Sequence, residues 1–515
     1  EELARIRQHP NRKYFIFKSI IVNNLFGVDI MEEAIEICKL RLFLKLVSQV
    51  DDVSKIEPLP DIDFNIRAGN SLVGYANKEE IEKAKATKLD LSGAMKGIEG
   101  RIESANRALQ SFRSLQMRLG IPASELTEAK AEVKDRLAEI QGELDRDLAA
   151  FYGAHDMDQF VQTHQPFHWF VEFYSIMKSG GFDVIIGNPP FVEYGRVRDE
   201  YTVWGYQTES CGNLYAFIIE RSLKICRHEG RWGLIMQLSS VSTRNMTPLH
   251  NFVRSGCSEL YISCYAERPQ QLFTGACIPL AIMIGRRNNT NRLKCTTFTT
   301  AVYRWHESER NTLFQRLQYC KHSDVIDDTH FFVPKIQSAL ELSIYEKFFA
   351  QAPISKYRLS TINQNNIYYR TAGGRYWKVI LNFPFGNEST ANKVTSFQQN
   401  LPALVAVSIL SSNLFWWYYI ISFDLYNLKD YVLFDFRFSC DIADPTTLQK
   451  LTQLGKQLMS DYRKNANQKT VFIRSKQQYA TYPEYLPRLS KPIIDEIDRV
   501  LAKHYGLTEE ELDFV

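Results

Sequence analysis

The chain has 515 residues, of which 45% are hydrophobic and 13% aromatic, and its formal net charge is +3. This length suffices for two or three domains with separate cores, and the small charge excludes a global basic field for nucleic acid. The nine cysteines form no C-x-x-C pair, which argues against zinc ribbons and disulfide frameworks. No signal peptide or membrane-spanning apolar run occurs, so we expect a cytoplasmic protein with reduced thiols, no metal and no membrane partner.

The first informative segment is a short apolar strand, Leu25 to Val28, that delivers Asp29 to its C-terminal end. Apolar residues at a spacing of about 3.6 predict a helix directly afterwards. An acid in this position commonly binds the ribose hydroxyls of a nucleotide. A carboxylate that caps the following helix explains Asp29 equally well.

A second strand is predicted to run into Gly69-Asn70-Ser71, which again places polar side chains at the end of a strand. On its own this segment is typical of a turn. Together with Asp29 and Asn188, Asn70 makes a set of three polar residues at three strand ends, as a nucleoside-bearing cofactor and a base would require.

Residues 76–165 interrupt the predicted sheet. Apolar residues at heptad-like steps lie on both sides of Gly120-Ile121-Pro122, which predicts a helical hairpin with charged outer faces. We expect a simple insertion here.

The central segment is an apolar run, Phe182 to Ile186, followed by Gly187-Asn188-Pro189-Pro190-Phe191. The run predicts a buried parallel strand, and the two prolines make the next residues a rigid loop at its C-terminal end. Open α/β sheets bind their ligands at such ends.

The Asn188 amide oxygen and the Pro189 carbonyl are two hydrogen-bond acceptors, and Phe191 adds an aromatic face. This set suits the exocyclic amine of a planar base. Two accepted hydrogen bonds draw the amine nitrogen toward sp³ geometry and free its lone pair for attack, so no strong base is needed. An enzyme acting on such a base in a duplex must first flip it out of the stack.

Beyond this motif, Tyr194 lies in a loop that could line a base pocket, and Leu214 to Ile225 is predicted to be a helix. Further apolar strands are predicted at Trp232 to Leu238 and at Ile278 to Ile284. This order fits the second half of a doubly wound sheet.

The sequence after residue 330 mixes aromatic rings, amides and cations. Asn363 to Asn366 could contact base edges, although a polar loop is the commoner explanation. The segments with interleaved rings and cations, and the basic stretch, suit either phosphate contact or a solvated face: these are Tyr368-Tyr369-Arg370, Arg375-Tyr376-Trp377-Lys378, and Lys456, Arg463, Lys464, Lys469, Arg474 and Lys476. Leu414-Phe415-Trp416-Trp417 is predicted to be core.

These motifs resemble the gamma-class adenine-N6 DNA methyltransferases of type IIG-like restriction-modification systems. The matching segments, spread over nearly the whole chain, are Phe26 to Ile30, Gly69 to Leu72, Phe182 to Phe191, Leu214-Tyr215, Glu220 to Leu223, Ile494 to Asp498 and Tyr505 to Thr508.

The resemblance implies a Rossmann-like, doubly wound methyltransferase sheet with a helical-hairpin insertion and an α+β target-recognition domain. The implied boundaries are 1–75 and 166–330 for the methyltransferase domain, 76–165 for the insertion, 331–480 for target recognition and 481–515 for a helical tail. The implied partners are S-adenosylmethionine, double-stranded DNA with a flipped base, and further chains or domains of a restriction-modification system.

The implied roles follow the matching positions. Asp29 with Ile30 would hold the ribose of S-adenosylmethionine, and Asn70 with Ser71 its adenine. Asn188, Pro189, Pro190 and Phe191 would bind the target amine and base, with Phe273 and Tyr194 also contacting the base.

One feature of the family is missing. No glycine-rich Asp-Pro-x-Cys-Gly-Ser-Gly-type loop occurs, and the family pattern places it before Glu1, so we expect a fragment. Two alternatives stay open: a non-catalytic DNA-binding chain, and a methyltransferase acting on RNA or a protein glutamine.

Overall fold

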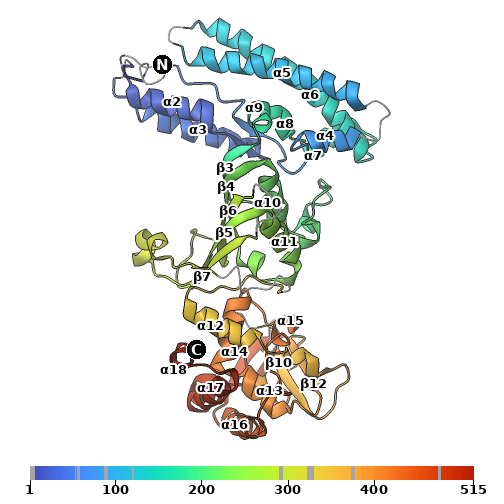
Figure 1. The fold of residues 1–515 in the computed structure, drawn as a ribbon, viewed down its shortest axis with the longest axis vertical. Coiled ribbons are helices and arrows are strands. Elements are labelled where there is room, and N and C mark those ends of the chain that lie inside the picture. Colours follow the sequence, from blue (N-terminus) through green and yellow to red (C-terminus); the bar gives the residue numbers. More distant parts are fainter. Residues whose placement is uncertain are drawn as a thin grey trace. The chain divides into compact units, whose positions relative to one another are not determined.

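The computed structural model describes the chain except residues 1–5, 8, 53, 55–57, 86–90, 119–120, 276, 289–293, 322–329, 373–376, 387 and 474–476. The chain forms two compact units, Glu1–Leu234 with Gly285–Arg292, and Ile235–Ile284 with Leu293–Val515. Figure 1 shows the ribbon of both. The units are described one at a time.

The first unit combines short parallel strands with long helices. Its elements in chain order are α2 (Arg12–Asn24), β1 (Gly27–Asp29), α3 (Glu32–Val47), β2 (Ile66–Ala68), α4 (Lys78–Lys85), α5 (Leu91–Gln116), α6 (Ala123–Phe151), α7 (Met157–His164), α8 (Trp169–Glu172), α9 (Tyr174–Lys178), β3 (Phe182–Gly187), α10 (Leu214–Ile225) and most of β4 (Cys226–Gln237).

The strands between residues 27 and 321 form two sheets in the described chain, where the sequence predicts one doubly wound sheet. β1 and β2 pair in parallel as a two-stranded sheet, while a six-stranded sheet has the order β3-β4-β6-β5-β7-β8. The six-stranded sheet is mixed, because β3 pairs with β4 in parallel and β7 with β8 antiparallel. A mixed α/β class is therefore confirmed. The expected single sheet is divided because, among the described residues, β1 and β3 do not pair and no strand connects them by hydrogen bonds.

The predicted burial of the central strand is wrong. β3 is parallel, but it is the edge strand of its sheet, with β4 as its neighbour. Val184 and Ile186 are consequently exposed, Ile186 to 82%. Parallel strands normally have both faces covered, so a parallel edge strand with exposed apolar side chains, as β3 is here, is unusual.

α5 and α6 pack against each other along their lengths, as Figure 1 shows. Their apolar residues at heptad-like steps are buried between them: Ile98, Ile102, Ala105, Leu109 and Phe112 on α5, and Val133, Leu137, Ile140, Leu144 and Leu148 on α6. Arg113 of α5 lies over the Phe26 ring, 5.3 Å from its centroid, and so contacts the start of β1. Burial lowers the Arg113 pKa to about 10.

The second unit contains the remaining strands and the C-terminal helices. In chain order these are α11 (Thr247–Gly256), β5 (Cys257–Tyr265), β6 (Leu280–Arg287, in part), β7 (Thr296–Tyr303), β8 (Cys320–Lys321), α12 (Ala339–Phe349), β9 (Arg358–Leu359), β10 (Asn366–Arg370), β11 (Ile380–Leu381), β12 (Asn392–Phe397), α13 (Ala403–Leu410), α14 (Asn413–Ser422), α15 (Asp430–Leu433), α16 (Pro445–Lys464), β13 (Asn467–Ile473), β14 (Gln478–Glu484), α17 (Lys491–Tyr505) and α18 (Glu509–Phe514).

The core of this unit surrounds α13 and α14. Leu414, Phe415 and Trp417 are buried there, as the aromatic run predicts. An antiparallel sheet of order β11-β10-β12-β9 adds Ile367, Tyr369 and other side chains to the same core. No single helix in the described residues is long and apolar enough to cross a membrane; α13 and α14 together are, but they bend by 63° and are largely buried.

Candidate functional site

Two of the predicted strand-end residues lie side by side in the first unit. β1 and β2 are in register with Asp29 opposite Ala68, and the Gly69 N–H donates to the Asp29 carbonyl over 2.9 Å. The next residue, Asn70, therefore follows directly beyond the end of β2. The sheet brings the Asp29 and Asn70 segments to one edge.

Asp29 is not the cap of the following helix. The residue in the N-cap position of α3 is Met31, which makes no side-chain cap bond. Asp29 Oδ1 instead accepts from the Met31 N–H over 2.9 Å, and its other carboxylate oxygen has no hydrogen-bond partner among the described residues. Asp29 and Ile30 are both exposed. This geometry leaves an acceptor oxygen available to a ligand.

Asn70 is buried, with 3% of its surface exposed. Its Oδ1 accepts from the Leu72 N–H over 3.1 Å, but its Nδ2 is buried without a hydrogen-bond partner in the described chain. A buried unpaired donor costs about 1–3 kcal/mol, so this amide suits an acceptor supplied from outside. Ser71 is half-buried, and its carbonyl accepts from Trp169 Nε1 over 3.1 Å.

The loop after β3 exposes the predicted amine-binding side chain. Asn188 and Pro190 are exposed, Pro189 is buried and Phe191 is half-buried. The chain after Phe191 is fixed by two backbone hydrogen bonds of 3.0 Å, Tyr194 N to Gly212 O and Leu214 N to Val192 O. The loop is therefore anchored beside the start of α10.

Tyr194 and Phe273 have different surroundings. Tyr194 is buried, its ring packs edge-on against Phe217 at 5.2 Å, and its hydroxyl accepts from the Val203 N–H over 2.9 Å. The Tyr194 side chain thus packs inside the protein and supports the loop to which it belongs. Phe273 lies in the second unit, between β5 and β6, and is 41% exposed.

β1 and β3 share an aromatic cluster although they belong to different sheets. Phe26, just before β1, and Phe182, the first residue of β3, have ring centroids 6.0 Å apart. Both also contact Phe173, at 5.3 and 5.5 Å. Val28 and Ile185 pack against the same cluster. Asp29 and Asn188 thus follow two strands that start from one apolar core.

Sequence reasoning missed the residue that holds the Asn70 loop in place. Arg221 of α10 is buried, and its Nη2 donates to the carbonyls of Leu72 (3.0 Å) and Gly74 (3.1 Å). Its Nε donates to the Tyr206 hydroxyl (2.9 Å) and its Nη1 to Glu80 Oε2 (3.2 Å). The Tyr206 hydroxyl in turn donates to the Leu72 carbonyl over 2.7 Å.

Near neutral pH, Tyr206 of this network is uncharged and Glu80 is charged. Burial raises the pKa of Tyr206 well above its ordinary value, so the hydroxyl stays a donor. Burial also acts to raise the pKa of Glu80, but the Arg221 charge and the Ala76 N–H outweigh it and the pKa falls below its ordinary value. The Arg221–Glu80 pair is therefore ionised near neutral pH.

A second set of contacts ties the same loop to the helical hairpin. The Tyr75 N–H donates to His168 Nδ1 over 3.3 Å, which places the His168 proton on Nε2, 3.0 Å from Asp145 Oδ1 of α6. Gly74 adopts φ +118°, and a Cβ there would lie 2.3 Å from the Phe167 carbonyl oxygen. This position requires glycine.

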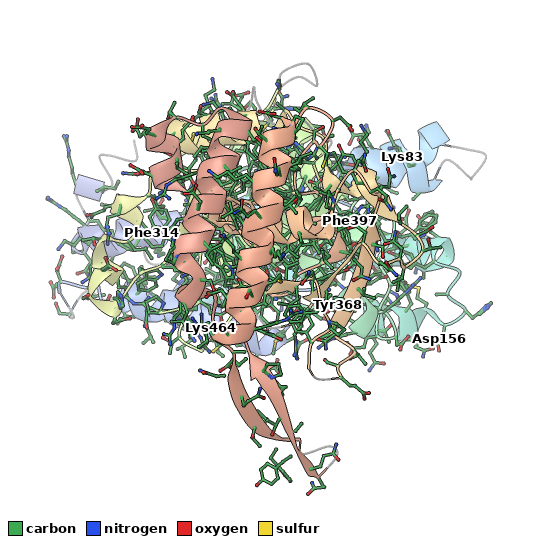
Figure 2. The ribbon with its side chains drawn as sticks, turned by 90° about the horizontal axis from the view of Figure 1, so that it is seen from below. Lys83, Asp156, Phe314, Tyr368, Phe397 and Lys464 are labelled. Atoms are coloured by element: carbon green, nitrogen blue, oxygen red, sulfur yellow. The ribbon has the colours of Figure 1, made fainter. Side chains whose placement is uncertain are left out.

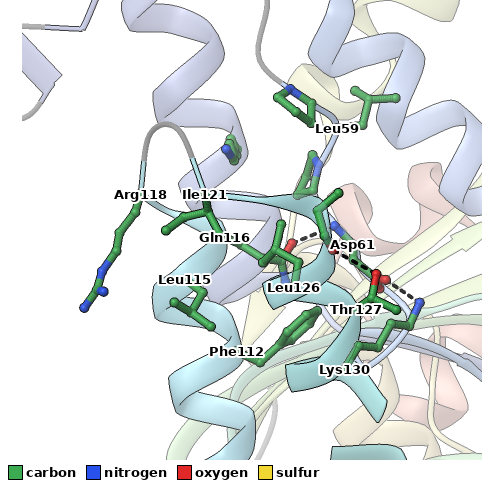
Figure 3. Close-up of a pocket in the computed structure, with 14 residues that line it drawn as sticks. Leu59, Asp61, Phe112, Leu115, Gln116, Arg118, Ile121, Leu126, Thr127 and Lys130 are labelled. Carbon is green, nitrogen blue, oxygen red and sulfur yellow. Dashed lines mark hydrogen bonds and ion pairs between the residues drawn. The ribbon is translucent and has the colours of Figure 1, made fainter. Parts of the chain in front are cut away.

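A separate cavity of about 320 Å³ lies between α5, α6 and the 58–61 segment (Figure 3). Gln116 Oε1 accepts there from the Asp61 N–H over 2.6 Å, and Lys130 pairs with Asp61 and Asp63. Its lining residues include none of the predicted site residues.

Three side chains of the recognition-like segments, Asn365, Trp377 and Lys378, make contacts within the second unit. Asn365 Nδ2 donates to the Phe397, Gln398 and Leu401 carbonyls, so this amide fixes its own loop. Trp377 stacks on Trp416 at 5.5 Å, and Lys378 is buried near Tyr419, where burial lowers its pKa to about 8. Four of the predicted positions lie outside the described residues: Arg375, Tyr376, Arg474 and Lys476.

Comparison with known proteins links the first part of the chain to a methylase family. Residues 23–267 match the model of the Eco57I restriction-modification methylase family. The chain is 28% identical over 337 residues to a Methanocaldococcus jannaschii protein named as a type II restriction enzyme and methyltransferase. That alignment covers 55% of this chain, which spans only 28% of the relative's length.

Solved structures give weaker matches. A type IIL restriction-modification enzyme, MmeI, in complex with DNA is 11% identical, with 97% of this chain and 72% of that chain covered, at a TM-score of 0.37. A nuclease-deletion mutant of the type ISP enzyme LlaGI with a DNA substrate mimic is 10% identical, with 64% and 46% covered, at a TM-score of 0.31. Both TM-scores are too low to establish a shared fold.

Substitution of Gly74 tests the packing of the Asn70 loop. We expect Gly74→Ala to lower the free energy of unfolding by at least about 2 kcal/mol, because the added Cβ meets the Phe167 backbone at a strained φ. Urea unfolding measures the change. The control is Gly100→Ala. Gly100 is an exposed residue of α5 where a Cβ meets nothing within 4 Å, so this substitution should be neutral or slightly stabilising. Equal stability of Gly74→Ala and the unmodified chain would contradict the packing described.

Removal of the Tyr206 hydroxyl tests the Arg221 network. Tyr206→Phe should cost about 1–2 kcal/mol, since the Leu72 carbonyl and Arg221 each lose a partner. Hydrogen exchange of the amides at 70–75 should quicken in parallel. The matched control is Tyr201→Phe, a buried tyrosine of the same segment whose hydroxyl has no hydrogen-bond partner in the described chain. Loop exchange that is identical in both variants would refute the network's role.

Proposed function

We propose that this chain belongs to an S-adenosylmethionine-dependent adenine-N6 DNA methyltransferase of a restriction-modification system, and that it carries residues for cofactor binding, base binding and target recognition. The observation that carries the proposal is the Asn188-Pro189-Pro190-Phe191 loop after parallel strand β3, with Asn188 exposed. This loop lies within the residues that match a restriction-modification methylase family.

The residues at the first two strand ends fit the nucleoside part of the cofactor. Asp29 offers a carboxylate oxygen without a protein partner to the ribose hydroxyls, and Asn70 Nδ2, buried and unpaired among the described residues, can donate to a ring nitrogen of adenine. Ile30 and Ser71 adjoin them. S-adenosylmethionine, when bound, supplies the methyl group.

The chain's own residues prepare the target amine. Asn188 Oδ1 and the Pro189 carbonyl accept its two N–H groups, which localises the nitrogen lone pair and directs it outward. The half-buried Phe191 ring stacks on one face of the flipped base. We assign Tyr194 to supporting the loop.

The presence of the second unit favours DNA over a protein or RNA as the substrate. The chain continues for more than 200 residues beyond the matched family segment, which ends at 267, and compact protein-amide methylases need no such addition. A non-catalytic DNA-binding chain is the second candidate. It is favoured by the free edge of β3, where Ile186 is uncovered.

Cofactor binding is tested with Asp29. We expect calorimetric titration of the chain with S-adenosylmethionine to show binding that weakens about tenfold or more in Asp29→Ala, because a hydrogen bond to a charged group is lost. Asn24→Ala, an exposed neighbour at the end of α2, should bind normally. If the folded chain does not bind the cofactor, the nucleoside-binding role of Asp29 and Asn70 is wrong and the non-catalytic candidate gains support.

Methyl transfer is tested with Asn188. In an assay that follows labelled methyl groups from S-adenosylmethionine into duplex DNA, Asn188→Ala should lower the rate by about a hundredfold or more, because an acceptor that acts on the reacting amine is gone. Cofactor affinity should stay unchanged, since Asn188 contacts the other substrate. A rate in Asn188→Ala close to that of the unmodified chain would rule out the proposed amine site.

A further inference from the structure

The hairpin of β13 and β14 stands apart from the core of the second unit. The two strands pair only with each other, and Figure 2 shows them extending beyond the helices from the end of α16, where Lys464 is labelled. An isolated two-stranded hairpin is marginally stable in water. Its tip region nevertheless carries apolar side chains into solvent: Phe472 is 42% and Tyr479 75% exposed.

The register places these side chains on one face of the ribbon. Phe472 lies opposite Tyr479, with ring centroids 5.1 Å apart, and Thr470 lies opposite Thr481, with hydroxyl oxygens 2.9 Å apart. Since side chains two residues apart on a strand share a face, the aromatic pair and the threonine pair are adjacent. Gln468 continues this face toward the base of the hairpin.

The surroundings of the hairpin are basic. Among the described residues from 463 to 488, four are basic and Glu484 alone is acidic. Lys469 pairs with Glu484. Lys464 at the end of α16 and Arg488 just after β14 are exposed and have no carboxylate partner in the described chain. Positive charge thus flanks the base of the ribbon, and rings and hydroxyls occupy its length.

We propose that the β13–β14 hairpin inserts into a groove of duplex DNA, with Lys464 and Arg488 on the phosphates. This inference rests on the proposed DNA methyltransferase function and deepens it by naming the contacting element. The major groove is about 12 Å wide and admits a two-stranded β-ribbon. Cations at the base supply phosphate contacts, while Thr470, Thr481 and Gln468 offer donors and acceptors to base edges.

The charge pattern favours DNA over a protein partner. A protein-binding patch would require a desolvated apolar centre with few charges. Here the exposed large apolar side chains of the described hairpin are one ring pair and Val471 on a narrow ribbon, and other exposed groups are hydroxyls, amides and the cations at its base.

Fluorescence anisotropy with mixed-sequence duplex DNA over a salt series tests this proposal on the full chain. The variant Phe472→Ala/Tyr479→Ala should bind about tenfold more weakly because it loses apolar contacts in the groove. Its melting temperature should be unchanged because both rings are exposed. Lys464→Gln should lower the slope of log K against log salt by about one. Phe314→Ala, which removes another exposed ring (59%) outside the hairpin, should match the unmodified chain.

Unchanged DNA affinity in the double variant together with an unchanged salt slope in Lys464→Gln would overturn the proposal. Absence of duplex binding by the unmodified chain would overturn it too. A shift in oligomeric state of the double variant, measured by light scattering, with DNA affinity preserved would assign the hairpin to a second copy and refute DNA contact. In each case the cofactor titration, which needs no DNA, reports on the proposed function independently.

Discussion

The buried guanidinium of Arg221 is the interaction on which the candidate site depends. A buried cation must have its donors satisfied, and Arg221 achieves this with two loop carbonyls, a tyrosine hydroxyl and a carboxylate. The two carbonyls belong to Leu72 and Gly74, so the charge fixes the path of the chain just after Asn70. Removing one partner of such a buried pair typically costs about 3–5 kcal/mol, which makes the loop conformation strongly determined.

α10 thereby links the two halves of the site. Its C-terminal half carries Arg221, which holds the Asn70 loop, and its N-terminus follows Asn213, whose neighbours Gly212 and Leu214 hydrogen-bond to the chain after Phe191. Asn213 also caps the helix by accepting from the Tyr215 N–H. The proposed cofactor-binding and amine-binding segments are positioned by opposite ends of one helix, although neither segment lies on it.

Local patterns in the sequence predict the elements of this site but not their long-range supports. The helix at Leu214 to Ile225 has the predicted bounds, and the loop of prolines follows a parallel strand as expected. The role of Arg221 could not be predicted, because Glu80 and the Leu72 carbonyl, which it contacts, lie 141 and 149 positions away in the sequence. The sequence of the motif Glu220 to Leu223 does not indicate whether its arginine is buried or exposed to solvent.

The prediction for β3 failed for a related reason. An apolar run such as Phe182 to Ile186 indicates a strand with both faces covered, but it does not show whether a neighbouring strand is present. For the amide run, the commoner explanation of a polar loop agrees with the Asn365 side chain, which donates to backbone carbonyls of its own surroundings.

In the second unit, the residues that stabilise the fold differ from the exposed residues of the β13–β14 hairpin. Its core is rich in aromatic rings packed between α12, α14 and the four-stranded sheet, where truncation of a Phe or Trp leaves a cavity and costs about 3–5 kcal/mol. The rings of the β13–β14 hairpin bury little, so their replacement has a small effect on folding. Residues on the exposed ribbon can change without disturbing the core, while Trp417 or Tyr419 cannot.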